Sequence, residues 1–235
     1  MPGRPPKVGH IRDAFLRSSQ SARDLVNAVR DLSGIEVAAG PARLHPEHSR
    51  RVVELAFLGL IAAWEEFLEQ SFVRYLAGAT ADNGYRAPLR LGQASSISHA
   101  YQLISGDPDF DPSRNYSKFG EARWVIATAK NYFDLGAPYA PILHQHAELL
   151  QHANKLRNRV AHNSAKSRED FKRSARVHLG LAPTVALTQG YGVGDLLLAP
   201  AARMFGQPVS DSGVSFFRAY VSRLRKIAKH ICPGA

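Results

Sequence analysis

A long apolar stretch in the first third of the chain constrains the fold most. Residues 55–64, LAFLGLIAAW, are apolar on nearly every side of a helix, and they lie inside a helical pattern that runs from about 46 to 78. A helix that is apolar all round is buried, either in a protein core or in a membrane. These ten residues are too few to span a bilayer. The pattern therefore predicts a central helix inside the core of the fold.

Most of the remaining chain also shows helical periodicity, and alternating β patterns are scarce. Further helices are expected at about 10–32, 94–105, 119–134, 140–162, 167–179 and 211–231, with an irregular segment at 182–208. This order predicts an all-α helical bundle with additional N- and C-terminal helices. We expect a disordered basic tail at 1–9 and a single helical domain over 10–235. Its core would span about 45–180, followed by a C-terminal loop and helix over 181–235.

The composition favours a polyanionic partner and a reducing compartment. Apolar residues make up 45% of the 235 residues, which is enough for a core, and the formal net charge is +10. Such a basic balance is typical of proteins that bind nucleic acid. The single cysteine, Cys232, excludes an internal disulfide and a multi-cysteine zinc site. We therefore expect a cytoplasmic protein with no membrane partner.

The segment KLRNRVAHNS at 155–164 contains the pair of residues best suited to catalysis, Arg157 and His162. On a helical wheel over 143–162, Arg157 falls inside the apolar sector, where a charge is costly unless it is paired or serves a site. His162 falls at the predicted helix end, where Asn163 suits a cap and Ser167 with Asp170 resembles a capping box for the next helix. Histidine titrates near neutral pH, so His162 suits general acid or base work.

The spacing of this pair is not specific by itself. The same spacing, Arg followed five positions later by His, also occurs at Arg43/His48, Arg173/His178 and Arg225/His230. Those matches lie in a loop that contains proline or in dense basic runs, so the surroundings of Arg157 single it out.

The residues around Arg157 resemble a known signature. Arg157-Asn158-Arg159-Val160-Ala161-His162 resembles the motif of HEPN domains, in which Arg and a polar residue precede His by a few positions. Upstream, the Trp64-Glu65-Glu66-Phe67 stretch is similar to the Trp-Glu-x-Phe helix of HEPN groups in prokaryotic defence and conflict systems, including the RiboL-PSP type. The resemblance covers about 45–180.

The resemblance implies a metal-independent endoribonuclease that needs no cofactor. HEPN proteins typically form homodimers in which the two Arg–His motifs face each other across the two-fold axis. His162 would move protons, Arg157 would bind the phosphate, and Asn158 would orient the phosphate or His162. Glu65 would pair with Arg157, with Glu66 and Glu69 as substitutes. The products would carry 2′,3′-cyclic phosphate and 5′-OH ends.

The resemblance also implies a biological role, as a toxin or antiviral defence effector with a possible cognate antitoxin. Basic residues next to the motif would follow the RNA backbone and make binding depend on salt: Lys155, Arg159, Lys166, Arg168, Lys172 and Arg173. His144, Glu148 and His152 repeat at a helical spacing that could hold a metal. They equally match an ordinary polar helix face, and we expect no metal there.

Three other interpretations remain open from the sequence. Arg157 could form a structural ion pair with a glutamate of the central helix and nothing more. The chain could be a non-catalytic HEPN-like module that binds RNA or a partner protein. It could also be a DNA-binding regulator, because GRPPK at 3–7 is similar to an AT-hook core.

Overall fold

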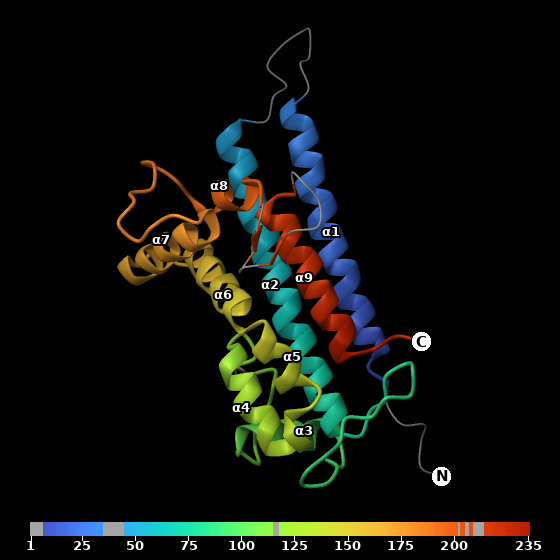
Figure 1. Ribbon diagram of the computed structural model, residues 1–235. Helices are drawn as coiled ribbons and strands as arrows, with labels where there is room; N and C mark the ends of the chain where they lie inside the picture. The colour runs from blue at the N-terminus through green and yellow to red at the C-terminus, as the bar shows by residue number, and fades with distance from the viewer. Residues whose placement is uncertain (1–6, 35–44, 115–117, 202, 205–206, 209–213) are drawn as a thin grey trace. The chain divides into compact units, whose positions relative to one another are not determined.

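The computed structural model describes residues 7–34, 45–114, 118–201, 203–204, 207–208 and 214–235. These residues are mostly helical, which confirms the predicted all-α class (Figure 1). The helices are α1 (Gly9–Gly34), α2 (Pro46–Leu76), α3 (Ile97–Ser105), α4 (Ala122–Tyr132), α5 (Tyr139–Gln145), α6 (Ala147–Ala161), α7 (Ala165–Leu179), α8 (Val193–Leu198) and α9 (Phe216–Ile231). A 3-10 turn, η1 (Asp134–Gly136), precedes α5. The short strands β1 (Arg203–Met204) and β2 (Gln207–Pro208) pair antiparallel, with Arg203 opposite Pro208.

The chain divides into two compact units, each built from separate stretches of sequence. Unit 1 comprises Met1–Leu16, Ala63–Ala147 and Leu224–Ala235, and unit 2 comprises Arg17–Ala62 and Glu148–Arg223. Three helices are divided between the units, with one part of each helix in unit 1 and the other part in unit 2: α1, α2 and α9. The single domain expected over 10–235 stays a prediction.

Helix α2 is the central helix that the apolar stretch predicts. It begins at Pro46, whose fixed backbone angle suits the first helical position. It ends before Gly78, which adopts a left-handed φ of 80°. The Gly78 amide donates to the Tyr75 carbonyl and the Ala79 amide to the Arg74 carbonyl, which is the Schellman pattern of helix termination.

The core of unit 1 is a cluster of aromatic rings around the second half of α2. The Phe72 ring contacts the rings of Phe119, Phe133 and Tyr139, with centroid distances of 5.5, 5.0 and 4.9 Å. These rings are buried, and the Tyr139 hydroxyl donates to Ser71 Oγ at 2.9 Å. Burial of large rings in edge and tilted contacts is a strong stabilising term, so this cluster holds η1 and α5 against α2.

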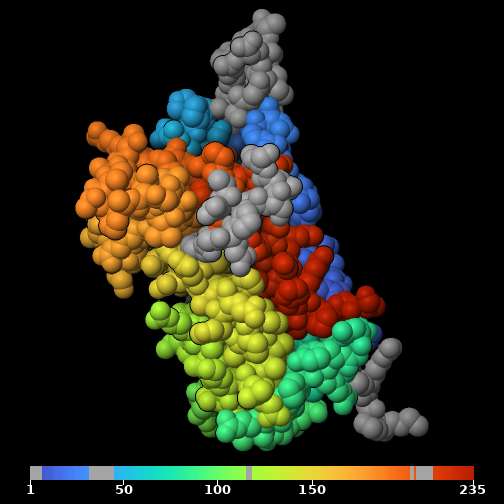
Figure 2. Space-filling view, viewed as in Figure 1, coloured from blue at the N-terminus to red at the C-terminus, as the bar shows by residue number. Residues whose placement is uncertain are grey.

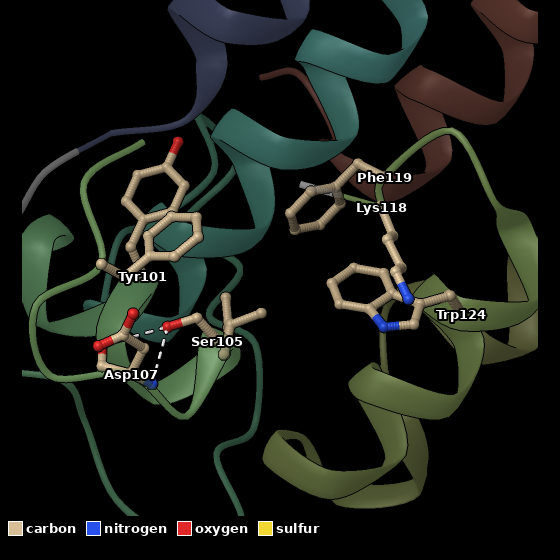
Figure 3. A pocket seen from close by; sticks show the side chains of 8 residues that line it. Tyr101, Ser105, Asp107, Lys118, Phe119 and Trp124 are labelled. Atoms are coloured by element: carbon tan, nitrogen blue, oxygen red, sulfur yellow. Dashed lines mark hydrogen bonds between the residues drawn. The ribbon is translucent and has the colours of Figure 1, made fainter. Parts of the chain in front are cut away.

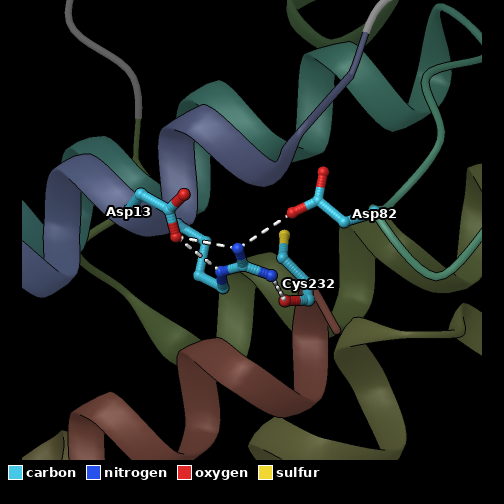
Figure 4. A network of polar contacts seen from close by, with 4 residues as sticks. Asp13, Asp82 and Cys232 are labelled. Carbon is cyan, nitrogen blue, oxygen red and sulfur yellow. Dashed lines mark hydrogen bonds and ion pairs between the residues drawn. The ribbon is translucent and has the colours of Figure 1, made fainter. Parts of the chain in front are cut away.

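A buried arginine joins both ends of the chain within unit 1 (Figure 4). Arg12 of α1 is 9% exposed and makes ion pairs with Asp13 at 2.8 Å and Asp82 at 2.9 Å. It also donates to the Cys232 carbonyl at 3.3 Å. Burial raises the pKa of the Cys232 thiol to about 12, so this cysteine is a core thiol in its neutral form.

The core of unit 2 forms where the first half of α2 meets α8 and α9. The Phe57 ring lies edge-on to the Tyr220 ring of α9, with centroids 5.3 Å apart. An ion pair and a hydrogen bond hold α8 on α2: Asp195 pairs with Arg50 at 2.6 Å, and the Gly194 amide donates to Glu54 at 3.1 Å.

Three sequence predictions need correction. The helix expected over 140–162 is two helices, because His146 leaves helical geometry with φ −117° and ψ 15°. The irregular segment at 182–208 contains α8 and both strands. Of the tail expected at 1–9, residues 1–6 lie outside the described residues. Val8 is buried and its amide donates to the Thr80 carbonyl, so the packed chain begins before residue 10.

We predict that Arg12→Leu lowers the free energy of unfolding by about 3 kcal/mol, because it leaves the Asp82 carboxylate and the Cys232 carbonyl without their cation. Chemical denaturation measures this change. The control is Arg114→Ala, which removes an exposed pair with Asp111 and should change stability by less than about 0.5 kcal/mol. Equal stability of both variants would show that the buried network contributes nothing.

Candidate functional site

Three of the four predicted catalytic residues, Arg157, Asn158 and His162, lie at the end of α6, in unit 2. Arg157 and Asn158 belong to its last two turns, and His162 follows the final residue, Ala161. The Arg157 side chain is half-buried, whereas the His162 imidazole is exposed. The helix end therefore exposes the imidazole of His162 to solvent, while Arg157, five residues earlier, is partly shielded.

Asn158 is hydrogen-bonded to both Arg157 and His162. Its side-chain oxygen accepts a hydrogen bond from Arg157 Nη1 at 3.1 Å, and its carbonyl accepts the His162 amide at 2.9 Å. The second bond extends the last helical turn to His162, so Asn158 and His162 are one turn apart. The predicted role of Asn158, to orient the phosphate or His162, stays a prediction.

The backbone of His162 is fixed from the next helix. Ser164 is the N-cap of α7, and its hydroxyl accepts the Ser167 amide at 3.1 Å. Ser167 Oγ in turn donates to the carbonyls of His162 at 2.8 Å and Ser164 at 2.9 Å. The predicted capping box of Ser167 with Asp170 is therefore wrong, because the N-cap of α7 is Ser164, three residues earlier. We refer to residues 157–168 as the α6–α7 corner.

Two of the predicted RNA-binding arginines converge on one asparagine in this corner. Asn163 Oδ1 accepts from Arg159 Nη1 at 2.9 Å and from Arg168 Nη1 at 3.2 Å. Lys172 pairs with Glu169 at 2.8 Å. On α7 the cationic side chains are exposed and contribute to the surface drawn in orange in Figure 2: Lys166, Arg168, Lys172 and Arg173. Lys155 is half-buried on α6.

The inner face of α6 follows the predicted apolar sector as far as Leu156, whereas Val160 is half-buried and Ala161 is exposed. Leu149, Leu150, Ala153 and Leu156 are buried, as the wheel predicts. His152, which the sequence groups with His144 and Glu148 on a possible polar helix face, is also buried, at 6% exposure. The suggested metal trio of His144, Glu148 and His152 is not supported. Among the described residues, no group of three or more His, Cys, Asp or Glu could hold a metal ion.

The glutamates proposed to support Arg157 have separate surroundings in unit 1. The Glu65 carboxylate lies against Gly120, where an added Cβ would come within 2.7 Å of its oxygen. Glu69 accepts a hydrogen bond from the Tyr101 hydroxyl at 2.7 Å, and Glu66 is exposed. The pairing of Glu65 with Arg157 stays a prediction, since the two residues belong to different units.

The Trp-Glu-x-Phe stretch supplies core residues. Trp64 and Phe67 are 4% and 1% exposed, and each packs on Phe15 of α1 with centroids about 5.5 Å apart. These two side chains therefore join α2 to α1 within unit 1.

The other Arg–His matches on described residues have structural roles. Arg225 donates to the Leu16 carbonyl at 2.6 Å. His178 bonds the Ser174 carbonyl through Nδ1 at 2.7 Å and the Tyr220 hydroxyl through Nε2 at 2.9 Å. A carbonyl only accepts, so Nδ1 carries the proton and Nε2 accepts from tyrosine.

Sequence reasoning missed a buried histidine pair in unit 2. The rings of His152 and His178 meet edge-on, with centroids 5.4 Å apart. Burial, together with the nearby His178 and Lys155, lowers the pKa of His152 to about 4. Burial likewise lowers the pKa of His178, against the opposing effect of its hydrogen bond to Ser174. The one available signal was the position of His152 beside Leu149 and Ala153 on the wheel.

No family model matches the sequence, and comparison with curated proteins and with solved structures returns no match. The resemblance to HEPN domains therefore rests on the motif residues themselves. Among the helices that the structure describes, none combines the length and the apolar content needed to cross a bilayer.

We predict that stability falls between pH 6.5 and pH 4 through His152. Its pKa is lower in the folded state, so over this window the unfolded chain takes up a proton that the folded chain does not. The free energy of unfolding that His152 contributes is lost completely once the pH falls through its folded-state pKa. This loss amounts to about 3 kcal/mol at most. Urea denaturation at several pH values measures it.

His152→Asn removes this titration, so the stability difference between wild type and variant should shrink as pH falls through that window. His144→Asn is the matched control, because His144 is exposed. A difference between wild type and His152→Asn that is constant with pH would contradict the prediction.

Proposed function

We propose that the protein is an endoribonuclease of HEPN type that cleaves RNA through His162 and Arg157 without a metal ion. One observation carries the proposal. The His162 imidazole is exposed while its backbone is bound by Asn158, Ser167 and Arg159, with Arg157 joined to the same asparagine. A general acid or base works best when it is accessible and held in place.

The chemistry follows from these residue types. RNA supplies its own nucleophile, the 2′-OH, which loses its proton to a base and attacks the adjacent phosphorus. The bond from phosphorus to the 5′ oxygen breaks, and that oxygen takes up a proton from an acid. His162 serves in this proton transfer. The Arg157 guanidinium stays charged and binds phosphate oxygens, so it stabilises the negative charge of the transition state. The products are a 2′,3′-cyclic phosphate and a 5′-OH.

The wider assembly is part of the same proposal. The exposed cations of α7 bind the RNA backbone, which makes association sensitive to salt. Two chains form a homodimer in which both Arg–His motifs face one groove. The role as a toxin or antiviral effector, with a cognate antitoxin, comes from the resemblance to HEPN domains. Glu65 is proposed to hold Arg157 in position.

Cleavage of end-labelled RNA in EDTA tests the proposal. We expect wild type to release cyclic-phosphate ends, and His162→Ala and Arg157→Ala to lower the cleavage rate by about 100-fold or more, since each removes a group that acts in the transition state. Circular dichroism should show that His162→Ala retains its helix content, because the imidazole is exposed.

The matched control is His230→Ala, an exposed histidine at the end of α9, which should cleave at the wild-type rate. A His162→Ala variant as active as wild type would refute the catalytic assignment. Salt-sensitive RNA binding without cleavage, retained in both motif variants, would instead favour a non-catalytic RNA-binding module.

A further inference from the structure

Unit 1 contains an aromatic pocket that the proposed cleavage does not use (Figure 3). Its volume is about 350 Å³, which lies in the range of small-ligand sites. Helix α3 contributes Tyr101, the following loop contributes Asp107 and Phe110, and the segment leading into α4 contributes Lys118 and Phe119. Trp124 of α4, together with Ile104 and Ser105 at the end of α3, completes the lining. All of these residues belong to unit 1.

Two pairs of rings form opposite walls of this pocket. Tyr101 and Phe110 are stacked, with planes 18° apart and centroids at 6.0 Å. Phe119 and Trp124 meet edge-on, at 83° and 5.2 Å. Figure 3 shows Tyr101 on one side of the opening and the Phe119–Trp124 pair on the other. Tyr101 and Phe119 are themselves buried, so Phe110 and Trp124 supply the accessible rings on the two sides, and a flat ligand between these sides gains stacking contacts on both.

The walls are held before any ligand arrives. The Tyr101 hydroxyl donates to Glu69 at 2.7 Å and accepts from Gln70 at 3.0 Å, which fixes the plane of its ring. Phe119 is 2% exposed and packs on Phe72 of the aromatic core. Rings that are already ordered lose little conformational entropy on binding, so stacking converts efficiently into affinity.

The charged groups of the pocket narrow the class of ligand. Lys118 is exposed and supplies a cation next to the Phe119–Trp124 wall. Asp107 supplies a carboxylate on the opposite side, and its backbone is held by Ser105 Oγ. A cationic ligand, which aromatic cages otherwise attract, meets repulsion from Lys118. An aromatic group matches the ring walls, a negative charge on it matches Lys118, and hydrogen-bond donors match the Asp107 carboxylate.

We propose that this pocket binds a purine nucleotide, with the base between the two aromatic walls, its N–H groups toward Asp107 and its phosphate at Lys118. The large face of a purine gives the greatest overlap with the rings. The nucleotide is either free or part of a single-stranded RNA. This site is independent of the proposed cleavage, because its residues lie in unit 1 and its test measures binding alone.

Quenching of tryptophan fluorescence by AMP, GMP, UMP and hexa-adenylate tests the proposal on the full chain. Trp124 lines the pocket, and the only other tryptophan, Trp64, is 4% exposed in the core. We expect saturable quenching by AMP and GMP, and weaker binding of UMP. Phe110→Ala should weaken binding by about tenfold or more, because it removes one ring from the stacked wall. Lys118→Ala should weaken it by about fivefold, because it removes the phosphate contact.

Lys130→Ala is the matched control, an exposed lysine of α4 that does not line this pocket, and it should bind as wild type does. Quenching by hexa-adenylate alone would support the same site with RNA as the source of the nucleotide. Ribose 5-phosphate binding as tightly as AMP would overturn base recognition. Absence of quenching by every nucleotide probe, or saturable quenching by choline in place of AMP, would refute the proposal.

Discussion

The burial of α2 on several sides organises both units. Apart from an exposed stripe at Leu55, Gly59, Ala62 and Glu66, this helix is apolar on most sides and needs cover from more than one direction, which no single neighbouring segment can supply. In unit 1 its second half packs on Phe15 of α1 and on Phe133 and Tyr139, which flank η1. In unit 2 its first half packs on Tyr220 of α9 and is bonded to α8. The separate stretches of chain that make up each unit follow from this requirement.

Hydrogen bonds and ion pairs of buried polar groups then determine which segments pack against one another. Arg12 binds Asp82 and the Cys232 carbonyl, so α1, the segment after α2 and the end of α9 meet in one arrangement. In unit 2, His178 similarly joins α7 to α9 through Tyr220. An unpaired buried charge or hydrogen-bonding group is costly, so alternative packings that break these contacts are disfavoured.

The α6–α7 corner differs from both cores in what it leaves accessible. Its backbone is bonded through Ser164, Ser167 and Asn163, yet His162 and the α7 cations face solvent. The aromatic pocket of unit 1 has the complementary character, with ordered rings and few charges. A charged, accessible corner suits a phosphate backbone, and a stacked aromatic pocket suits a base. Both proposals therefore concern nucleotide chemistry, while each depends on its own residues.

The sequence by itself determined the helical class, the position of most helices and the place of the candidate motif. These features depend on local periodicity and on capping residues, as at Pro46 and Gly78, and such signals act over a few positions. It also located Arg157, Asn158 and His162 at a helix end, although the N-cap of α7, Ser164, was misjudged by three residues.

Only the tertiary structure decided which distant residues meet. It placed His152 against His178, Arg12 against Asp82 and Cys232, and the Tyr101–Phe110 pair opposite the Phe119–Trp124 pair. Helical periodicity specifies which face of a helix is buried but not which helix covers it. The packing of side chains from separate segments makes that choice, and with it the pKa of His152 and the shape of the pocket.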